Sequence, residues 1–259
     1  MHWRLLLSDP LDGTGNMALD EALLTRARGR DEYVMRVYGW VAPTLSLGRN
    51  QRAVGVFDSA TATRRNVVIV RRLTGGRAVL HHREVTYSVT GPAARSDTLR
   101  ASYAAINQIL LTALEQLGVP ASLAPSVQPG ARFPAPASAP CFELPAPGEI
   151  VLGNSKLVGS AQLRDDAAFL QHGSILIDDD QWRVAELTDA PMPAAAPAAT
   201  LRAALGRAPS LREVAEALFQ AVRVHAEAPP TPLEVEDDLQ RVMSAARERY
   251  RSDSWTWRR

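Results

Sequence analysis

Two reactive side chains, each the only one of its type, lie close together in the sequence: the thiol of Cys141 and the ammonium of Lys156. A thiol beside a cation ionises more easily and becomes a nucleophile, and lysine and arginine are not interchangeable at a reacting centre. The pair therefore indicates covalent acyl chemistry. Three plainer interpretations remain open at this point: codon bias that left one lysine, an exposed edge-strand lysine, and a buried inert thiol.

A glycine turn between arginines is the strongest local pattern. Residues 71–77, Arg-Arg-Leu-Thr-Gly-Gly-Arg, follow the β-branched run of residues 67–70, which predicts a strand buried on both faces. Paired glycines expose backbone N–H groups, and arginines hold a carboxylate, phosphate or carbonyl. The alternative is a tight hairpin turn with solvated arginines.

A second pattern joins Lys156 to the small residues Gly159, Ser160 and Ala161 in a predicted strand. Small side chains there leave room for a slender ligand. The chain's histidines do not predict a metal site, because no carboxylate stands at a recognisable ligand spacing. His81 and His172 lie beside apolar strand residues and are expected to be hydrogen-bonded core histidines.

Composition limits the possible classes of protein. The chain has 259 residues, a formal net charge of +1, 46% hydrophobic and 22% charged residues. These values are ordinary for a globular protein and give no reason to expect nucleic acid or an anionic membrane as a partner. A single cysteine excludes an internal disulfide, and no apolar run reaches the length of a signal-peptide core or a membrane span. We therefore expect the protein to lie in the reducing compartment of the cytoplasm.

Hydrophobic periodicity predicts a mixed α/β domain over residues 1–190. A Pro/Ala-rich linker and a helical tail, packed on the same domain, are expected over residues 191–259. Asn16 is expected to cap the first helix. Strands are predicted at residues 3–7, 33–38, 45–47, 67–70, 78–80, 85–89, 149–152, 156–162 and 169–177, helices at 102–117 and 211–225 and within 233–250, and an irregular loop at 120–140.

Taken together, these segments resemble the biotin/lipoate protein ligase superfamily, and most closely its cysteine-dependent octanoyltransferases. The likeness covers roughly residues 1–180, in the right order and spacing. The segments that carry it are Asn16-Met17-Ala18-Leu19-Asp20, residues 71–81, Glu84-Val85-Thr86-Tyr87-Ser88-Val89, Cys141-Phe142, residues 156–162 and Leu170-Gln171-His172-Gly173-Ser174-Ile175. The sequence departs from the family pattern in the Pro/Ala-rich residues 120–140 and at Gly148, where an aromatic residue is expected.

The resemblance implies a fold and a set of site residues. The fold is α/β (α+β), with a mixed, largely antiparallel sheet flanked by helices. Cys141 matches the nucleophile of the transferase branch, and Lys156 matches the lysine that contacts the acyl carbonyl. The strand residues 159–162 and 172–174 match the walls of the acyl tunnel. The matching substrate-binding positions, in the glycine turn and in these walls, are Arg71, Arg72, Gly75, Gly76, Arg77, Ala78, His81, Gly159, Ser160, Ala161, His172 and Gly173.

The activity implied is transfer of an octanoyl, or lipoyl, group in protein lipoylation, through a Cys141 thioester. The donor expected is octanoyl acyl carrier protein, and the acceptor is a lipoyl domain or a glycine-cleavage H-type protein. No cofactor, metal, nucleic acid or membrane is expected. Both carrier and lipoyl domains are acidic, so Arg49, Arg71, Arg72 or Arg77 could help to dock them.

Three alternatives stay open at this stage. An ATP-dependent lipoate–protein ligase would use Lys156 to bind an acyl-adenylate and would leave Cys141 incidental. A lipoyl-protein amidotransferase would use the same cysteine chemistry with a different donor. A binding module would hold an acylated protein without forming a covalent intermediate.

Overall fold

The computed structural model describes residues 2–93, 98–125, 148–165, 167–189 and 197–259. Cys141 lies outside the described residues. So does most of the predicted loop of residues 120–140.

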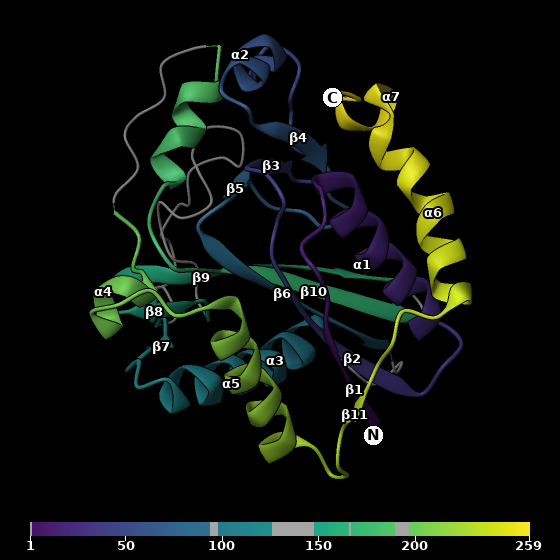
Figure 1. The fold of residues 1–259 in the computed structure, drawn as a ribbon, viewed down its shortest axis with the longest axis vertical. Coiled ribbons are helices and arrows are strands. Elements are labelled where there is room, and N and C mark those ends of the chain that lie inside the picture. The colour runs from purple at the N-terminus through teal and green to yellow at the C-terminus, as the bar shows by residue number, and fades with distance from the viewer. Residues whose placement is uncertain (1, 94–97, 126–147, 166, 190–196) are drawn as a thin grey trace.

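An eight-stranded sheet forms the centre of the molecule, in the order β11-β1-β2-β6-β10-β9-β8-β7 (Figure 1). Strand β1 pairs in parallel with β2 and β11, and every other neighbouring pair is antiparallel. The predicted mixed, largely antiparallel sheet is confirmed. The strands are β1 (His2–Leu7), β2 (Glu32–Tyr38), β6 (Glu84–Pro92), β7 (Ser122–Leu123), β8 (Ile150–Leu152), β9 (Ser155–Arg164), β10 (Ala168–Leu176) and β11 (Thr231–Pro232).

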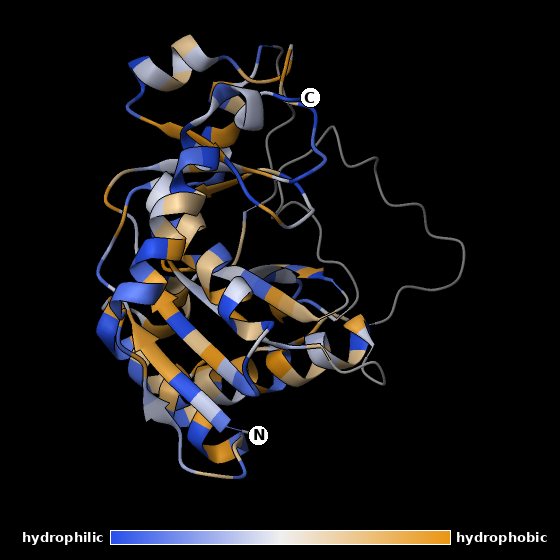
Figure 2. Cartoon of the chain, turned by 90° about the vertical axis from the view of Figure 1, so that its right-hand side faces the viewer, coloured by the Kyte–Doolittle hydropathy of each residue, from blue (hydrophilic) through white to orange (hydrophobic). Residues whose placement is uncertain are grey.

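Helices cover both faces of this sheet. Helices α3 (Leu99–Gln116) and α5 (Leu211–His225) pack together on one face, and α1 (Gly13–Ala27) lies on the other with α6 (Asp237–Arg251) along its outer side (Figure 1). The short helices are α2 (Ser59–Arg64), α4 (Leu201–Leu205), α7 (Asp253–Thr256) and the 3₁₀ helix η1 (Gln181–Leu187). Figure 2 shows strands banded by alternating apolar and polar residues, as expected when the two faces differ. No helix in the described part is long and apolar enough to cross a membrane.

A second, three-stranded sheet lies above the α1 face of the large one (Figure 1). It has the order β4-β3-β5, from β3 (Thr44–Leu47), β4 (Val68–Arg71) and β5 (Val79–His81). The sequence predicted the three strands but not their separation from the large sheet. Strand β4 is at the edge, and Val68 is 40% exposed, so the prediction of a strand buried on both faces was wrong.

Helix α1 begins three residues earlier than its predicted cap. Asp12 is the N-cap, and its Oδ1 accepts from the Gly15 amide at 2.7 Å. Asn16 is therefore inside the helix, fully buried, and its side-chain amide donates to the carbonyls of Leu11 and Gly39. Asn16 resembles a cap in the sequence because its actual role depends on tertiary contacts that the sequence does not show. That role is to hold the helix against two loops.

The C-terminal tail contacts the body of the molecule at several points. Strand β11 extends the edge of the large sheet through β1, and α6 packs along α1. Arg247 of α6 pairs with Asp12, the cap of α1, and Arg249 pairs with Glu21 within α1.

Candidate active site

A narrow pocket lies between the two sheets, with about 40 Å³ open to a water-sized molecule. Helix α1, the glycine turn and strands of both sheets contribute to its walls. Nine of its lining residues were predicted from the sequence: Arg72, Gly76, His81, Gly159, Ser160, Ala161, His172, Gly173 and Ser174. Five others were not predicted: Met17, Tyr38, Ser46, Val79 and Thr86.

The shape of the glycine turn depends on two glycines. Gly76 has φ +92°, a conformation that a side chain disfavours. At Gly48, a Cβ would come within 1.9 Å of the Gly76 carbonyl oxygen, so only glycine fits there. Gly48 was not predicted as a site residue, although the turn depends on it.

Arg72 organises the turn from inside. It is 3% exposed, and its Nη2 donates to the carbonyls of Gly75 and Arg77, both at 2.7 Å. Its Nη1 donates to the Ser46 carbonyl at 2.7 Å, which ties the turn to β3. The prediction of a substrate-binding arginine remains a prediction, because these bonds are to the protein's own backbone.

A buried chain of hydrogen bonds links the turn to helix α1 through His172. The Thr74 hydroxyl lies 2.6 Å from His172 Nε2, and His172 Nδ1 lies 3.2 Å from Asp20 Oδ2. Because Asp20 can only accept, His172 carries its proton on Nδ1 and accepts from Thr74 on Nε2. Burial lowers the pKa of His172 more than Asp20 raises it, so the ring is neutral.

Asp20 is the centre of this chain. Its carboxylate also accepts from Arg36 Nη1 at 2.7 Å, the Tyr38 hydroxyl at 2.9 Å and the Ser88 hydroxyl at 2.8 Å. Burial alone would raise the pKa of Asp20, but Arg36 and His172 outweigh burial and lower it. Asp20 therefore stays ionised and fixes the back of the pocket.

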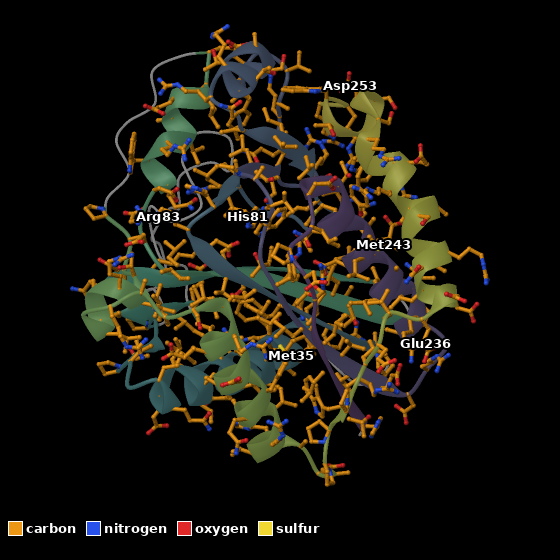
Figure 3. All side chains as sticks on the ribbon, viewed as in Figure 1. Met35, His81, Arg83, Glu236, Met243 and Asp253 are labelled. Atoms are coloured by element: carbon orange, nitrogen blue, oxygen red, sulfur yellow. The ribbon has the colours of Figure 1, made fainter. Side chains whose placement is uncertain are left out.

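His81 also lines the pocket and lies near the centre of the molecule in Figure 3. Its Nε2 is 2.8 Å from the Ser46 hydroxyl, and its Nδ1 is 3.3 Å from Glu84 Oε1. Its ring stacks on Trp40 with centroids 4.1 Å apart. His81 and His172 are both buried and hydrogen-bonded, as predicted for core histidines, and both line the pocket.

The other predicted residues of the turn, Arg71, Gly75, Arg77 and Ala78, are outside the pocket lining. Arg71 is fully buried and points away from the pocket, where it donates to the carbonyls of Gly48, Gln51 and Thr256. Burial and nearby arginines lower the pKa of Arg71 to about 10. The suggestion that Arg71 or Arg72 docks a partner was wrong, because neither side chain reaches the surface.

Lys156 is buried at the start of β9, and its Nζ donates to Glu149 Oε1 at 2.7 Å. It lies outside the pocket lining. The pairs Val151–Lys156 and Ile150–Val158 leave Leu157 as an extra residue on β9. This bulge interrupts the alternation of side chains. No sequence pattern indicated Glu149, which accepts from the ammonium and lies immediately before the neighbouring strand β8.

Within the described residues, no group of three or more histidines, cysteines, aspartates or glutamates could hold a metal ion. The expectation of no cofactor remains an expectation.

Comparison with known proteins identifies the family. The sequence profile described as "Lipoyl protein ligase A/B catalytic domain" matches residues 12–223. The chain belongs to this family, as the resemblance of its motifs predicted.

Among its relatives, Octanoyltransferase LipM of Kyrpidia tusciae is 36% identical over 271 residues, which cover 99% of each chain. Octanoyltransferase LipM of Moorella thermoacetica is 42% identical over 195 residues, covering 71% of this chain and 70% of its own. A solved structure of lipoate-protein ligase A bound with ATP has a TM-score of 0.79 at 21% identity over 99% of both chains, which shows that the fold is shared.

Proposed function

We propose that this protein transfers an octanoyl group from octanoyl acyl carrier protein to a lysine of a lipoyl-accepting protein, through a thioester on Cys141. The chain is an acyltransferase of protein lipoylation. The observation that carries this conclusion is full-length similarity to relatives named octanoyltransferase, joined to a narrow pocket that the predicted small residues line. The acceptor proposed is a lipoyl domain or an H-type protein, and the reaction is placed in the cytoplasm.

The reaction has two steps that balance without ATP. In the first, the Cys141 thiolate attacks the carrier thioester, the carrier's carbon–sulfur bond breaks, and the carrier thiol leaves with the proton. In the second, the acceptor amine attacks the Cys141 thioester. An amide forms, the Cys141–acyl bond breaks, and the proton from the nitrogen goes to the departing sulfur. The thioester preserves the free energy of the carrier bond between the steps.

Lys156 has an electrostatic role in this proposal. An ammonium stabilises a neighbouring thiolate and the oxyanion that develops during attack. The bond from Glu149 supports this role, because a carboxylate partner stabilises the charged form of a buried lysine. Glu149 is thus a positioning residue, which holds the ammonium at the start of β9.

The pocket supports the proposal through its lining. Gly159, Ala161 and Gly173 bring no bulky side chain, while Met17 and Val79 contribute apolar surface. Small and apolar residues in the wall suit an unbranched acyl chain, whose burial is favourable by about 0.8 kcal/mol per methylene.

An ATP-dependent lipoate ligase is the rival that shares this fold. Several relatives named octanoyltransferase align over nearly the whole chain at 32–36% identity, whereas the solved lipoate-protein ligases are 20–21% identical. We therefore rank the transferase first and the ligase second. The amidotransferase differs only in its donor.

Intact-protein mass spectrometry after mixing with octanoyl acyl carrier protein, without ATP, tests the proposal. One octanoyl adduct is expected on the wild type and none on Cys141→Ala, whose fold is checked by its melting temperature. If only an octanoylated lipoyl domain acted as a donor, the protein would instead be an amidotransferase. Lipoate-dependent ATP–pyrophosphate exchange without any adduct would establish the ligase.

A further inference from the structure

Four exposed arginines gather where the C-terminal segment meets the loop after β3. Arg49 and Arg52 come from the loop, and Arg258 and Arg259 from the segment that follows α7. None of the four forms an ion pair with a carboxylate of the described residues, unlike Arg247 and Arg249 nearby on α6. We call these four residues the arginine surface.

Specific contacts build this surface. The guanidinium of Arg258 lies 4.0 Å from the centroid of the Trp255 ring and donates to the Arg49 carbonyl. The carbonyl of Arg259 accepts from the amides of Ala53 and Val54 at 2.7 and 2.9 Å. The two segments are therefore held together although about 200 residues separate them in sequence.

The arginine surface adjoins the pocket. The Arg49 amide donates to the Thr74 carbonyl at 2.8 Å, and the preceding Gly48 packs against the Gly76 carbonyl. Gly76 itself lines the pocket. A partner held by these arginines would thus lie against the glycine turn.

The positive charge beneath the surface is not neutralised within the described residues. Buried Arg71 donates only to carbonyls, and its Nη2 has no hydrogen-bond partner there. Burial, together with Arg49, Arg259 and Arg249, lowers the pKa of Arg258. Like charges held this close repel one another, and an approaching anionic partner would relieve that repulsion.

We infer that the arginine surface docks the acidic acyl carrier protein that delivers the acyl group, an inference that rests on the proposed function. A carrier presents its thioester on an arm joined through a phosphodiester, so negative charge accompanies the donor towards the pocket. Arginine binds phosphate and carboxylate groups in a bidentate manner. An acceptor lysine brings no such phosphate, which is why the donor is the partner assigned here.

The test compares two donors. The double variant Arg52→Glu/Arg259→Glu changes two exposed side chains and leaves Arg258 on Trp255. The matched control is Arg30→Glu/Arg223→Glu, with the same change of charge at exposed positions; Arg223 is on α5, at the opposite end of the molecule from α7 in Figure 1. Acylation is measured with octanoyl acyl carrier protein and with octanoyl-pantetheine, which has no phosphate.

We expect the surface variant to lose about tenfold or more in kcat/KM for the carrier and to keep its rate with octanoyl-pantetheine within about twofold. Raising the salt concentration should reduce the difference in kcat/KM for the carrier between the wild type and the surface variant. The control should react with both donors like the wild type, and equal melting temperatures confirm intact folding.

Three outcomes overturn the inference. One is an equal loss in surface and control variants. The second is unchanged carrier kinetics with slower transfer to the acceptor, which would assign the surface to the acceptor. The third is unchanged kinetics with loss of binding to a labelled DNA duplex, which would indicate nucleic acid. A wild type that neither donor acylates would contradict the proposed function itself, whatever the variants do.

Discussion

The two faces of the large sheet are built on different principles, although they share every strand. On strand β6, Val85 and Val89 point to the α3–α5 face and join the main apolar cluster, while Thr86 and Ser88 point to the α1 face. The α1 face holds the ion pair of Asp20 and Arg36, both almost completely buried.

The difference shows which contacts stabilise the fold and which contacts set the geometry of the site. Apolar packing is non-directional, so many arrangements of the α3–α5 face would bury a similar area. A buried polar network has few arrangements that satisfy every hydrogen-bonding group. Leaving one buried group without its partner costs a large amount of folding free energy. The pocket lies on the polar side, where its walls are held in one arrangement.

Removing the central carboxylate should break the polar face. Asp20→Ala leaves Arg36 buried without a counter-ion, and we expect a loss of about 4 kcal/mol in the free energy of unfolding. Urea denaturation followed by circular dichroism measures it. Ser88→Ala is the control, since it removes a single donor and should cost about 1 kcal/mol. Equal, small losses in both variants would show that the network is not centred on Asp20.

Opening a cavity on the apolar face should cost stability without touching the site. Leu110 of α3 is fully buried in the main cluster, and Leu110→Ala should lose about 3 kcal/mol. The rate of acylation per folded molecule should stay within about twofold of wild type. A much larger fall in that rate, measured well below the melting temperature, would contradict the separation of the two faces.

The smallest effect expected is a dependence of stability on pH that comes from His172. Its pKa is lowered in the folded state, so below pH about 6.5 the unfolded chain binds more protons and stability falls as pH falls. The contribution of His172 to the slope of the unfolding free energy against pH cannot exceed about 1.4 kcal/mol per pH unit.

His172→Gln keeps a donor and an acceptor but does not titrate. Its unfolding free energy should therefore change less between pH 7 and pH 5 than that of the wild type, in matched urea titrations. A variant with the same slope as the wild type would show that other groups set this dependence.

Local patterns were enough to find most of the large sheet and the longer helices. Strand periodicity located β6 and β10, and helical spacing located α3 and α5, because burial of one face imposes a period on the sequence. The short elements α2, α4, β7 and β11 were not predicted, since a few residues carry no measurable period.

The site was predictable in its residue types and less so in its contacts. The turn of residues 71–77 and the small residues of β9 were found, and nine predicted residues line the pocket. Glu149 and Gly48 were missed, because each acts on a group brought to it by another segment. The face of β9 to which Lys156 points could not be predicted from the alternation of side chains, because the bulge at Leu157 interrupts that alternation.

The sequence by itself determined the family, the reactive side chains and the mixed sheet, since these depend on residue identity and short-range periodicity. Only the tertiary structure decided which arginines are buried and which are exposed, and that His172 bridges Asp20 and Thr74. The physical reason is that desolvation and hydrogen-bond partners are set by distant segments: Arg71 is buried by residues of the C-terminal tail, which no local pattern can indicate.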